Sequence, residues 1–362
     1  MEFKKHLQKI KNYEPGLPIE EVVREFGIDA GDIVKLASNE NPFGCSQKAT
    51  QAVCDSAHMM YRYPDDTMGE LKSKLCSKYD IATQNLIIGS GSDQVIEFLI
   101  EAKAQKSILT SEVTFAMYAI YAAAKGIEVI RSKGLHHDLD QIYGLYKKHN
   151  PDIIFLCTPN NPTGDAIPTK AVYEFIEKID SDTLVVVDGA YGDYAAHKDS
   201  SYKIDPKDLI DRFDNVIYLA TFSKSFGLGG MRVGYGIAGA DIIKALYKLR
   251  PPFNVTTLSL VAASAALDDK DFVQDSIEKN FIYMKEYENF AKEIGIEYIP
   301  SYTNFITYIL KDFDSSQVCQ SLLEKGVIVR DLKGYNMNAI RITIGSKEQN
   351  SRFFETFKQV IG

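Results

Sequence analysis

The stretch VIYLATFSKSFGLGGMRVGY, residues 216–235, combines a strand pattern with the side chains that carry most of the chemistry in this chain. Its first residues, Val216 to Leu219, form a continuous apolar run, which is typical of a strand buried on both faces of a parallel sheet. Lys224 follows among hydroxyls and glycines, where burial can lower its pKa enough for the amine to react with an aldehyde. Eight positions later, Arg232 offers a fixed cation for a phosphate. A solvated surface lysine is the plain alternative, but such lysines are seldom set among so many glycines and so few charges.

Similar apolar runs precede this stretch and alternate with helix-like segments from about residue 85 onward. They lie at residues 86–88, 107–109, 128–130, 153–156 and 184–187. Strands of this kind, each bracketed by helices, predict an α/β fold with a mostly parallel sheet that is buried on both faces.

The C-terminal third follows a different pattern. Residues 256 to about 291 form one long helical stretch, and strand-like segments follow at 305–310, 327–330 and 340–344. This α+β arrangement predicts a second, smaller domain. Prolines near the N-terminus favour an extended arm there. The expected division is an N-terminal arm and small-domain segment at 1–35, a large domain at 36–253 and a small C-terminal domain at 254–362.

Length and composition limit the class of protein. A chain of 362 residues that is 45% hydrophobic and 25% charged is ordinary for a soluble globular protein with one large and one smaller domain. The formal net charge of −8 and the dispersed lysines give no general attraction for nucleic acid. No segment is apolar over the ~18 residues that a membrane span needs, so we expect no membrane insertion. The five cysteines are scattered and form no C-x-x-C pair, which argues against a disulfide framework or a zinc site and favours the reducing cytoplasm.

Three further motifs follow strand ends, where open α/β sheets place their ligands. The turn GSGSD, residues 89–93, can hold a phosphate on the first N–H groups of a helix, although a plain turn with Ser92 as the helix cap also explains it. The turn TPNNPTG, residues 158–164, can hold an asparagine amide rigidly, although Asn-Pro is a common turn former. Asp188 is costly to bury unless it meets a cation such as a protonated ring nitrogen; a helix cap or a solvated strand end is the alternative.

Taken in order, Asn161-Pro-Thr-Gly, Asp188 with Tyr191, Ser223-Lys224 and Arg232 resemble the fold-type I, aspartate-aminotransferase-like enzymes that use pyridoxal 5′-phosphate (PLP). Four segments resemble more narrowly the histidinol-phosphate aminotransferase family: LASNENPFG (36–44), RYPD (62–65), GSD (91–93) and RITIG (341–345). These matches run over nearly the whole chain. The resemblance implies a seven-stranded, mostly parallel sheet in the large domain. It also implies PLP-dependent transamination between histidinol phosphate and 2-oxoglutarate or glutamate, in histidine biosynthesis.

The resemblance further implies roles at the cofactor. Lys224 would hold PLP covalently and, once freed by substrate, move the proton of the substrate's alpha carbon. Asp188 would pair with the ring nitrogen, while Asn161 and Tyr191 would hydrogen-bond the ring's phenolic oxygen. The remaining contacts would be Phe115 over the ring face, Ser92, Asp93, Ser223 and Arg232 at the phosphate, and Tyr63 reaching across from the partner of a homodimer.

The substrate pocket is implied in the same way. Arg341 resembles the arginine that grips a substrate carboxylate by a two-pronged bond, a geometry that lysine cannot supply. Arg330, Tyr13 and Asn39 are candidates for the rest of the pocket, with Arg330 at the substrate phosphate. Arg330 could instead form a surface ion pair, and Tyr13 could anchor the N-terminal arm.

Three positions depart from the family pattern: Gln94, Val113 and Gly189 stand where glutamate, proline and glutamate are common. Relatives with the same cofactor site act on aromatic amino acids or on other small phosphorylated ketones, so these substrates stay open, as does a PLP decarboxylase or lyase reaction on the same scaffold. A cofactor-free binding protein with this fold is the alternative from another class. Arg341 favours transamination over decarboxylation, and Lys224 with Asp188 and Arg232 favours an enzyme over a binding protein.

Overall fold

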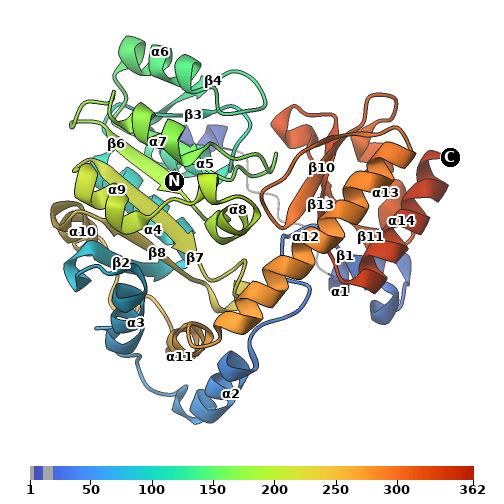
Figure 1. The fold of residues 1–362 in the computed structure, drawn as a ribbon, viewed down its shortest axis with the longest axis horizontal. Coiled ribbons are helices and arrows are strands. Elements are labelled where there is room, and N and C mark those ends of the chain that lie inside the picture. The colour runs from blue at the N-terminus through green and yellow to red at the C-terminus, as the bar shows by residue number, and fades with distance from the viewer. Residues whose placement is uncertain (1–3, 11–18) are drawn as a thin grey trace.

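A computed structural model describes residues 4–10 and 19–362 (Figure 1). Its largest sheet, here called the large sheet, has seven strands in the order β2-β8-β7-β6-β5-β3-β4. They are β2 (Leu86–Ser90), β3 (Ser107–Ser111), β4 (Glu128–Ser132), β5 (Ile153–Cys157), β6 (Leu184–Asp188), β7 (Val216–Thr221) and β8 (Val233–Ala238). Neighbouring strands are parallel except around β8, which runs antiparallel to β2 and β7. The predicted α/β class with a mostly parallel seven-stranded sheet is confirmed.

Helices cover both faces of the large sheet, as its continuous apolar strands require (Figure 1). One face packs against α3 (Gly69–Tyr79), α6 (Leu139–His149), α7 (Thr169–Ile176), α9 (Pro206–Arg212) and α11 (Thr257–Ala266). The other packs against α4 (Gly91–Lys103), α5 (Met117–Lys125) and α10 (Ala240–Tyr247). Successive residues of one strand enter opposite cores, since Val185 belongs to the first and Val186 to the second.

The C-terminal part forms a smaller unit around a four-stranded antiparallel sheet in the order β12-β13-β10-β9. Its strands are β9 (Glu297–Ile299), β10 (Phe305–Ile309), β12 (Arg330–Asp331) and β13 (Ala339–Thr343), and its helices are α12 (Lys270–Glu293), α13 (Ser315–Leu323) and α14 (Lys347–Ile361). The N-terminal segment joins this unit, because β1 (Val34–Lys35) pairs in parallel with β11 (Val327–Ile328). The other helices are α1 (Ile19–Phe26), α2 (Gln47–Ser56) and α8 (Gly192–Lys198).

Two expectations about the C-terminal part were wrong in detail. The helical stretch at 256–291 is two helices, because the Asp269 side chain accepts a hydrogen bond from the Phe272 N–H and caps a new helix, α12. The strand expected at 327–330 is split into β11 and β12, which pair with β1 and β13 respectively. The domain boundaries at residues 36 and 254 stay a prediction.

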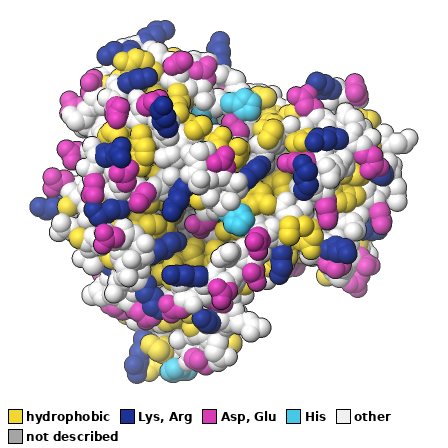
Figure 2. Space-filling view, in the orientation of Figure 1, with side chains coloured by type: hydrophobic (Ala, Val, Ile, Leu, Met, Phe, Trp, Pro, Cys, Tyr) yellow, Lys and Arg dark blue, Asp and Glu magenta, His cyan; other side chains and the backbone are white. Residues whose placement is uncertain are grey.

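The surface mixes charges of both signs. Figure 2 shows lysine and arginine side chains interspersed with aspartate and glutamate over the viewed face, and no single basic stripe crosses it. Within residues 4–10 and 19–362, no helix is both long and apolar enough to cross a bilayer. All five cysteines lie in this part of the chain and are free thiols.

Candidate active site

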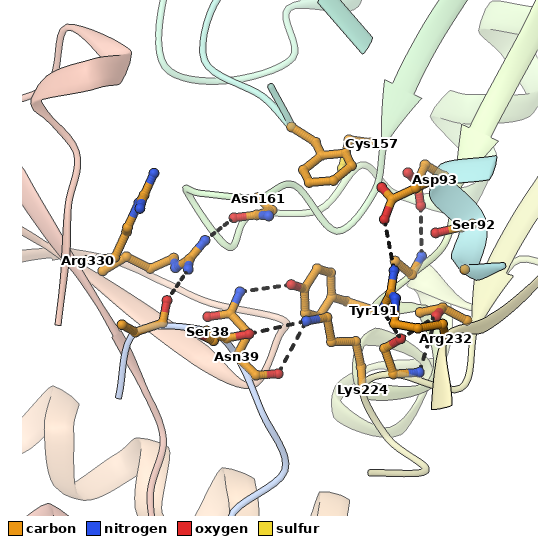
Figure 3. Close-up of a pocket in the computed structure, with 18 of the residues that line it drawn as sticks. Ser38, Asn39, Ser92, Asp93, Cys157, Asn161, Tyr191, Lys224, Arg232 and Arg330 are labelled. Atoms are coloured by element: carbon orange, nitrogen blue, oxygen red, sulfur yellow. Dashed lines mark hydrogen bonds and ion pairs between the residues drawn. The ribbon is translucent and has the colours of Figure 1, made fainter. Parts of the chain in front are cut away.

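A cavity of about 410 Å³ lies where the carboxyl ends of β5, β6 and β7 meet the smaller unit (Figure 3). Three neighbouring parallel strands end at its wall with Cys157, Asp188 and Thr221, so strand pairing alone brings these residues to one edge. The lining residues are Lys35, Ala37, Ser38, Asn39, Gly91, Ser92, Asp93, Phe115, Cys157, Asn161, Asp188, Ala190, Tyr191, Thr221, Ser223, Lys224, Arg232, Arg330, Tyr335 and Arg341. Of the predicted site residues that the structure describes, every one except Tyr63 is among them.

The Lys224 amine lies between two backbone carbonyl groups of the segment that leads in from β1. Its Nζ is 3.4 Å from the Ser38 oxygen and 3.3 Å from the Asn39 oxygen (Figure 3). Burial first, and then the nearby cation of Arg341, lower the pKa of Lys224 to about 8. A sizeable fraction of the amine is therefore neutral near physiological pH, which is the nucleophilic form.

Asp188 is a buried acid, only 3% exposed. Its Oδ2 accepts a hydrogen bond from the Tyr118 hydroxyl at 2.6 Å, and its Oδ1 accepts one from the Ala190 N–H at 3.0 Å. Burial nevertheless raises the pKa of Asp188 to about 6. Each carboxylate oxygen can accept a further bond, so a protonated ring nitrogen in the cavity would suit this group.

Another part of the cavity is built for an anion. Arg232 Nη2 lies 3.1 Å from Asp93 Oδ2, and Nη1 lies 3.5 Å from Ser223 Oγ. The N-terminus of α4 is adjacent, since a Cβ on Gly91 would lie 2.7 Å from Arg232 Nη2. The Thr221 hydroxyl donates to Ser223 Oγ at 3.0 Å. A guanidinium, two hydroxyls and a helix N-terminus are the groups that bind a phosphate.

These three features together fit PLP. The cofactor needs an amine for its aldehyde, an acid for its ring nitrogen and a cradle for its phosphate, and Lys224, Asp188 and Arg232 can supply them. Phe115 lines the same cavity, with its ring 5.6 Å from the Tyr118 ring in an edge-on arrangement.

The side of the cavity next to the smaller unit carries two arginines. Arg341 is 8% exposed; its Nη1 donates to Asn161 Oδ1 at 2.5 Å and its Nη2 to the Ala37 oxygen at 2.7 Å. Arg330 on β12 is directly opposite Arg341 on β13. Residues opposite each other on antiparallel strands share a face, and like charges there repel. Anions bound at this end of the cavity would relieve that repulsion.

One predicted site residue, Tyr63, does not line the cavity of its own chain. Tyr63 is 82% exposed and its ring stacks on Phe253 with centroids 4.7 Å apart. Tyr13 lies outside the described residues. The sequence reasoning missed Tyr118, the partner of Asp188; its position three residues after Phe115 is the one signal that could have identified it. It also missed Lys35, which directly precedes the motif at 36–44.

Known proteins with similar sequences and structures show the family to which the chain belongs. Residues 31–357 match the family model of aminotransferase class I and II. The chain is 60% identical over 358 residues to histidinol-phosphate aminotransferase of Sulfurimonas denitrificans, covering 98% of each chain, and 54% identical over 363 residues to that of Campylobacter lari, covering 99% of each. The structure of histidinol-phosphate aminotransferase from Sinorhizobium meliloti in complex with PLP shares the fold, with a TM-score of 0.89 at 24% identity over 99% of this chain and 97% of that one. The chain therefore belongs to the class I and II aminotransferases, within them to the histidinol-phosphate aminotransferase family, and is a PLP-dependent transaminase.

Proposed function

We propose that this enzyme exchanges the amino group of histidinol phosphate with 2-oxoglutarate, in histidine biosynthesis. The observation that carries the proposal is the pair of arginines, Arg330 and Arg341, directly opposite each other at the cavity. One substrate carries a phosphate and the other carries carboxylates, and both kinds of anion bind guanidinium groups by two parallel hydrogen bonds. The relatives, which are histidinol-phosphate aminotransferases, support the same substrate. Five free thiols suit the reducing cytoplasm as the site of this work.

The residues of the cavity have separate roles in this reaction. When bound, PLP supplies an aldehyde that reacts with amines and a ring that accepts electrons from the substrate's alpha carbon. Lys224, with its lowered pKa, takes up and releases the proton of that carbon near neutral pH. Asp188 holds a proton on the ring nitrogen, and Arg232 with Ser223 holds the cofactor phosphate. Arg341 holds the carboxylate of glutamate or 2-oxoglutarate, and Arg330 holds the phosphate of the other substrate.

The two half-reactions, measured separately, test these roles. Arg341→Ala leaves a buried carboxylate without its partner, which costs about 2–5 kcal/mol, so kcat/KM for glutamate should fall at least about thirtyfold. Arg341→Lys should recover little, because an ammonium cannot form the planar fork. Arg330→Ala should act mainly on histidinol phosphate. Since Arg341 also binds Asn161, the PLP content and thermal unfolding of each variant are the controls. Equal losses on both substrates in both variants would contradict separate carboxylate and phosphate roles.

We also propose a homodimer in which Tyr63 contributes to the partner's cavity. Tyr63 is 82% exposed, and three further large hydrophobic side chains are exposed as well: Met60 at 72%, Tyr61 at 74% and Phe253 at 42%. Exposed aromatic and methionine side chains of this kind favour a protein interface. Because Tyr63 is absent from the wall of its own cavity, a role at the cofactor requires the second subunit.

A further inference from the structure

Asn39 is a hydrogen-bonding hub between the two units of the chain. It is 2% exposed. Its N–H donates to Thr343 Oγ1 at 2.9 Å, and its Oδ1 accepts from the same hydroxyl at 3.2 Å. Its Nδ2 donates to the Tyr191 hydroxyl at 2.8 Å, and its carbonyl oxygen faces both Lys224 Nζ, at 3.3 Å, and Asn304 Nδ2, at 3.0 Å. Every polar group of Asn39 thus has at least one partner in the protein itself.

The contact with Tyr191 has a fixed direction. Thr343 receives the backbone N–H and gives its own proton to Oδ1, so the Asn39 amide nitrogen is the end that meets Tyr191. An amide nitrogen only donates, and the phenol oxygen must therefore accept. Burial raises the pKa of Tyr191, which keeps its own proton in place. The Tyr191 hydroxyl can therefore donate its proton only to an acceptor other than Asn39. Because Tyr191 lines the cavity, a group bound there can be that acceptor (Figure 3).

The contact with Lys224 depends on the backbone of Asn39. Its φ of 55° lies in the left-handed region, which asparagine tolerates better than most residues. This conformation presents its carbonyl oxygen to Lys224, next to that of Ser38. A neutral amine has two hydrogens, and two carbonyl oxygens can take both, which leaves the lone pair of Nζ for the reaction. Asn304, itself 1% exposed, holds the same carbonyl from the smaller unit.

We propose that Asn39 is a positioning residue, which acts on the reaction by directing the Tyr191 proton into the cavity and by orienting the Lys224 amine, rather than by touching substrate. This role differs from the substrate contact expected from the sequence. It does not depend on which amino donor the enzyme uses, because both partners belong to the cofactor end of the reaction.

Two substitutions separate the side chain from the backbone. In Asn39→Asp the carboxylate only accepts, so Tyr191 donates to it and its proton leaves the cavity. The new charge beside Lys224 also favours the protonated nitrogen. We expect kcat to fall at least about tenfold in both half-reactions, with KM for both substrates within about twofold, and the pH midpoint of the holoenzyme's visible absorption band to rise by about one unit. Asn39→Gly keeps the left-handed backbone, so it should lower kcat with a smaller change in the midpoint.

Controls and a double-mutant cycle make the test decisive. Asn150 is exposed and also left-handed, with φ of 47°, so Asn150→Asp and Asn150→Gly should change neither kcat nor the midpoint. If the Asn39 side chain acts through Tyr191, Asn39→Gly should cost little further kcat in a Tyr191→Phe background. Additive losses in that cycle would overturn the proposal. So would a raised KM for one substrate with an unchanged midpoint in Asn39→Asp, since that is the signature of a substrate contact. If Asn39→Asp does not fold, the cycle with glycine still decides.

Discussion

At the scale of single residues, the cavity contains ionisable groups whose charged form is disfavoured by burial. Asp188 is the sharpest case, because burial raises its pKa to about 6 from an ordinary value of 3.8. Between these two pH values the folded apoenzyme binds more protons than the unfolded chain, so its stability falls as the pH rises through this window. Above pH 6 the folded apoenzyme bears the full cost of burying the charged Asp188 carboxylate. This cost decreases as the carboxyl group becomes protonated at lower pH.

Asp188→Asn should therefore stabilise the apoenzyme while it abolishes transamination. The shift corresponds to a gain of up to about 3 kcal/mol at pH 7.5 and about 1 kcal/mol at pH 4.5. Urea unfolding of the two apoproteins at both pH values measures the difference. A gain that stays constant between pH 4.5 and 7.5 would show that the buried charge is not its cause.

Tyr118 offers a second prediction at this scale. Tyr118→Phe removes the hydroxyl that donates to Asp188 at 2.6 Å, and a lost hydrogen bond to a charged group costs about 1.5–3 kcal/mol. The pKa of Asp188 should rise further, because this hydrogen bond lowers it. We expect kcat to fall about tenfold or more, and the acid limb of the pH profile to move to higher pH. Tyr121→Phe is the matched control, since Tyr121 lies on the same helix and outside the cavity wall. Equal effects of both variants would assign the loss to helix packing.

The sequence predicted most residues of the cavity and missed Tyr118, which supports Asp188 from outside the cavity wall. Lys224 and Asp188 each follow an apolar run, so a strand end places them without further information. Tyr118 reaches Asp188 from a helix on one face of the sheet, a contact set by packing, and its spacing from Phe115 is the only trace of this contact in the sequence. Asn39 was expected in the substrate pocket and does line the cavity, but its partners Thr343 and Tyr191 lie far away in the sequence.

At the scale of elements, β8 is a strand of the large sheet that no separate apolar run in the sequence predicted. Three of its six positions carry small residues, Gly234, Gly236 and Ala238. The strand also begins soon after the loop that contains Lys224. The glycines have a packing reason. A Cβ on Gly234 would lie 2.1 Å from the Ser92 nitrogen, so β8 can pass the first turn of α4 only without a side chain there. Such close approaches weaken the strand signal in a sequence because they remove the residues that define it.

Gly234→Ala should displace the start of α4 and with it the phosphate cradle. We expect the affinity for PLP to fall at least about tenfold and the unfolding free energy of the apoenzyme to fall by about 1–3 kcal/mol, as for other overpacked sites. PLP titration and urea unfolding measure the two effects. Gly230→Ala is the control in the same glycine-rich segment, because a Cβ on Gly230 meets no atom within 4 Å. Unchanged PLP affinity in Gly234→Ala would mean that the cradle adapts to the added methyl group.

At the scale of the whole molecule, the proposed dimer predicts complementation between two inactive proteins. Tyr63→Ala keeps Lys224, and Lys224→Ala keeps Tyr63. If Tyr63 serves the partner's cavity, a hybrid purified through two different tags has one site with both residues and should show about half the wild-type kcat per dimer. Each variant alone should be far less active. A hybrid no more active than its parents would place Tyr63 outside the partner's site.

The pairing of β1 with β11 joins the first part of the chain to the last, and this sets an order on biosynthesis. A ribosome releases β1 early, yet its partner emerges only after every strand of the large sheet has been made. Domains generally fold as units as the chain appears, so the phosphate cradle can form while Arg330 and Arg341 are still untranslated. The nascent protein can therefore form a cofactor site before it forms a substrate site. Amino-group exchange can begin only once β11 has paired with β1 and the strands that carry Arg330 and Arg341 have folded.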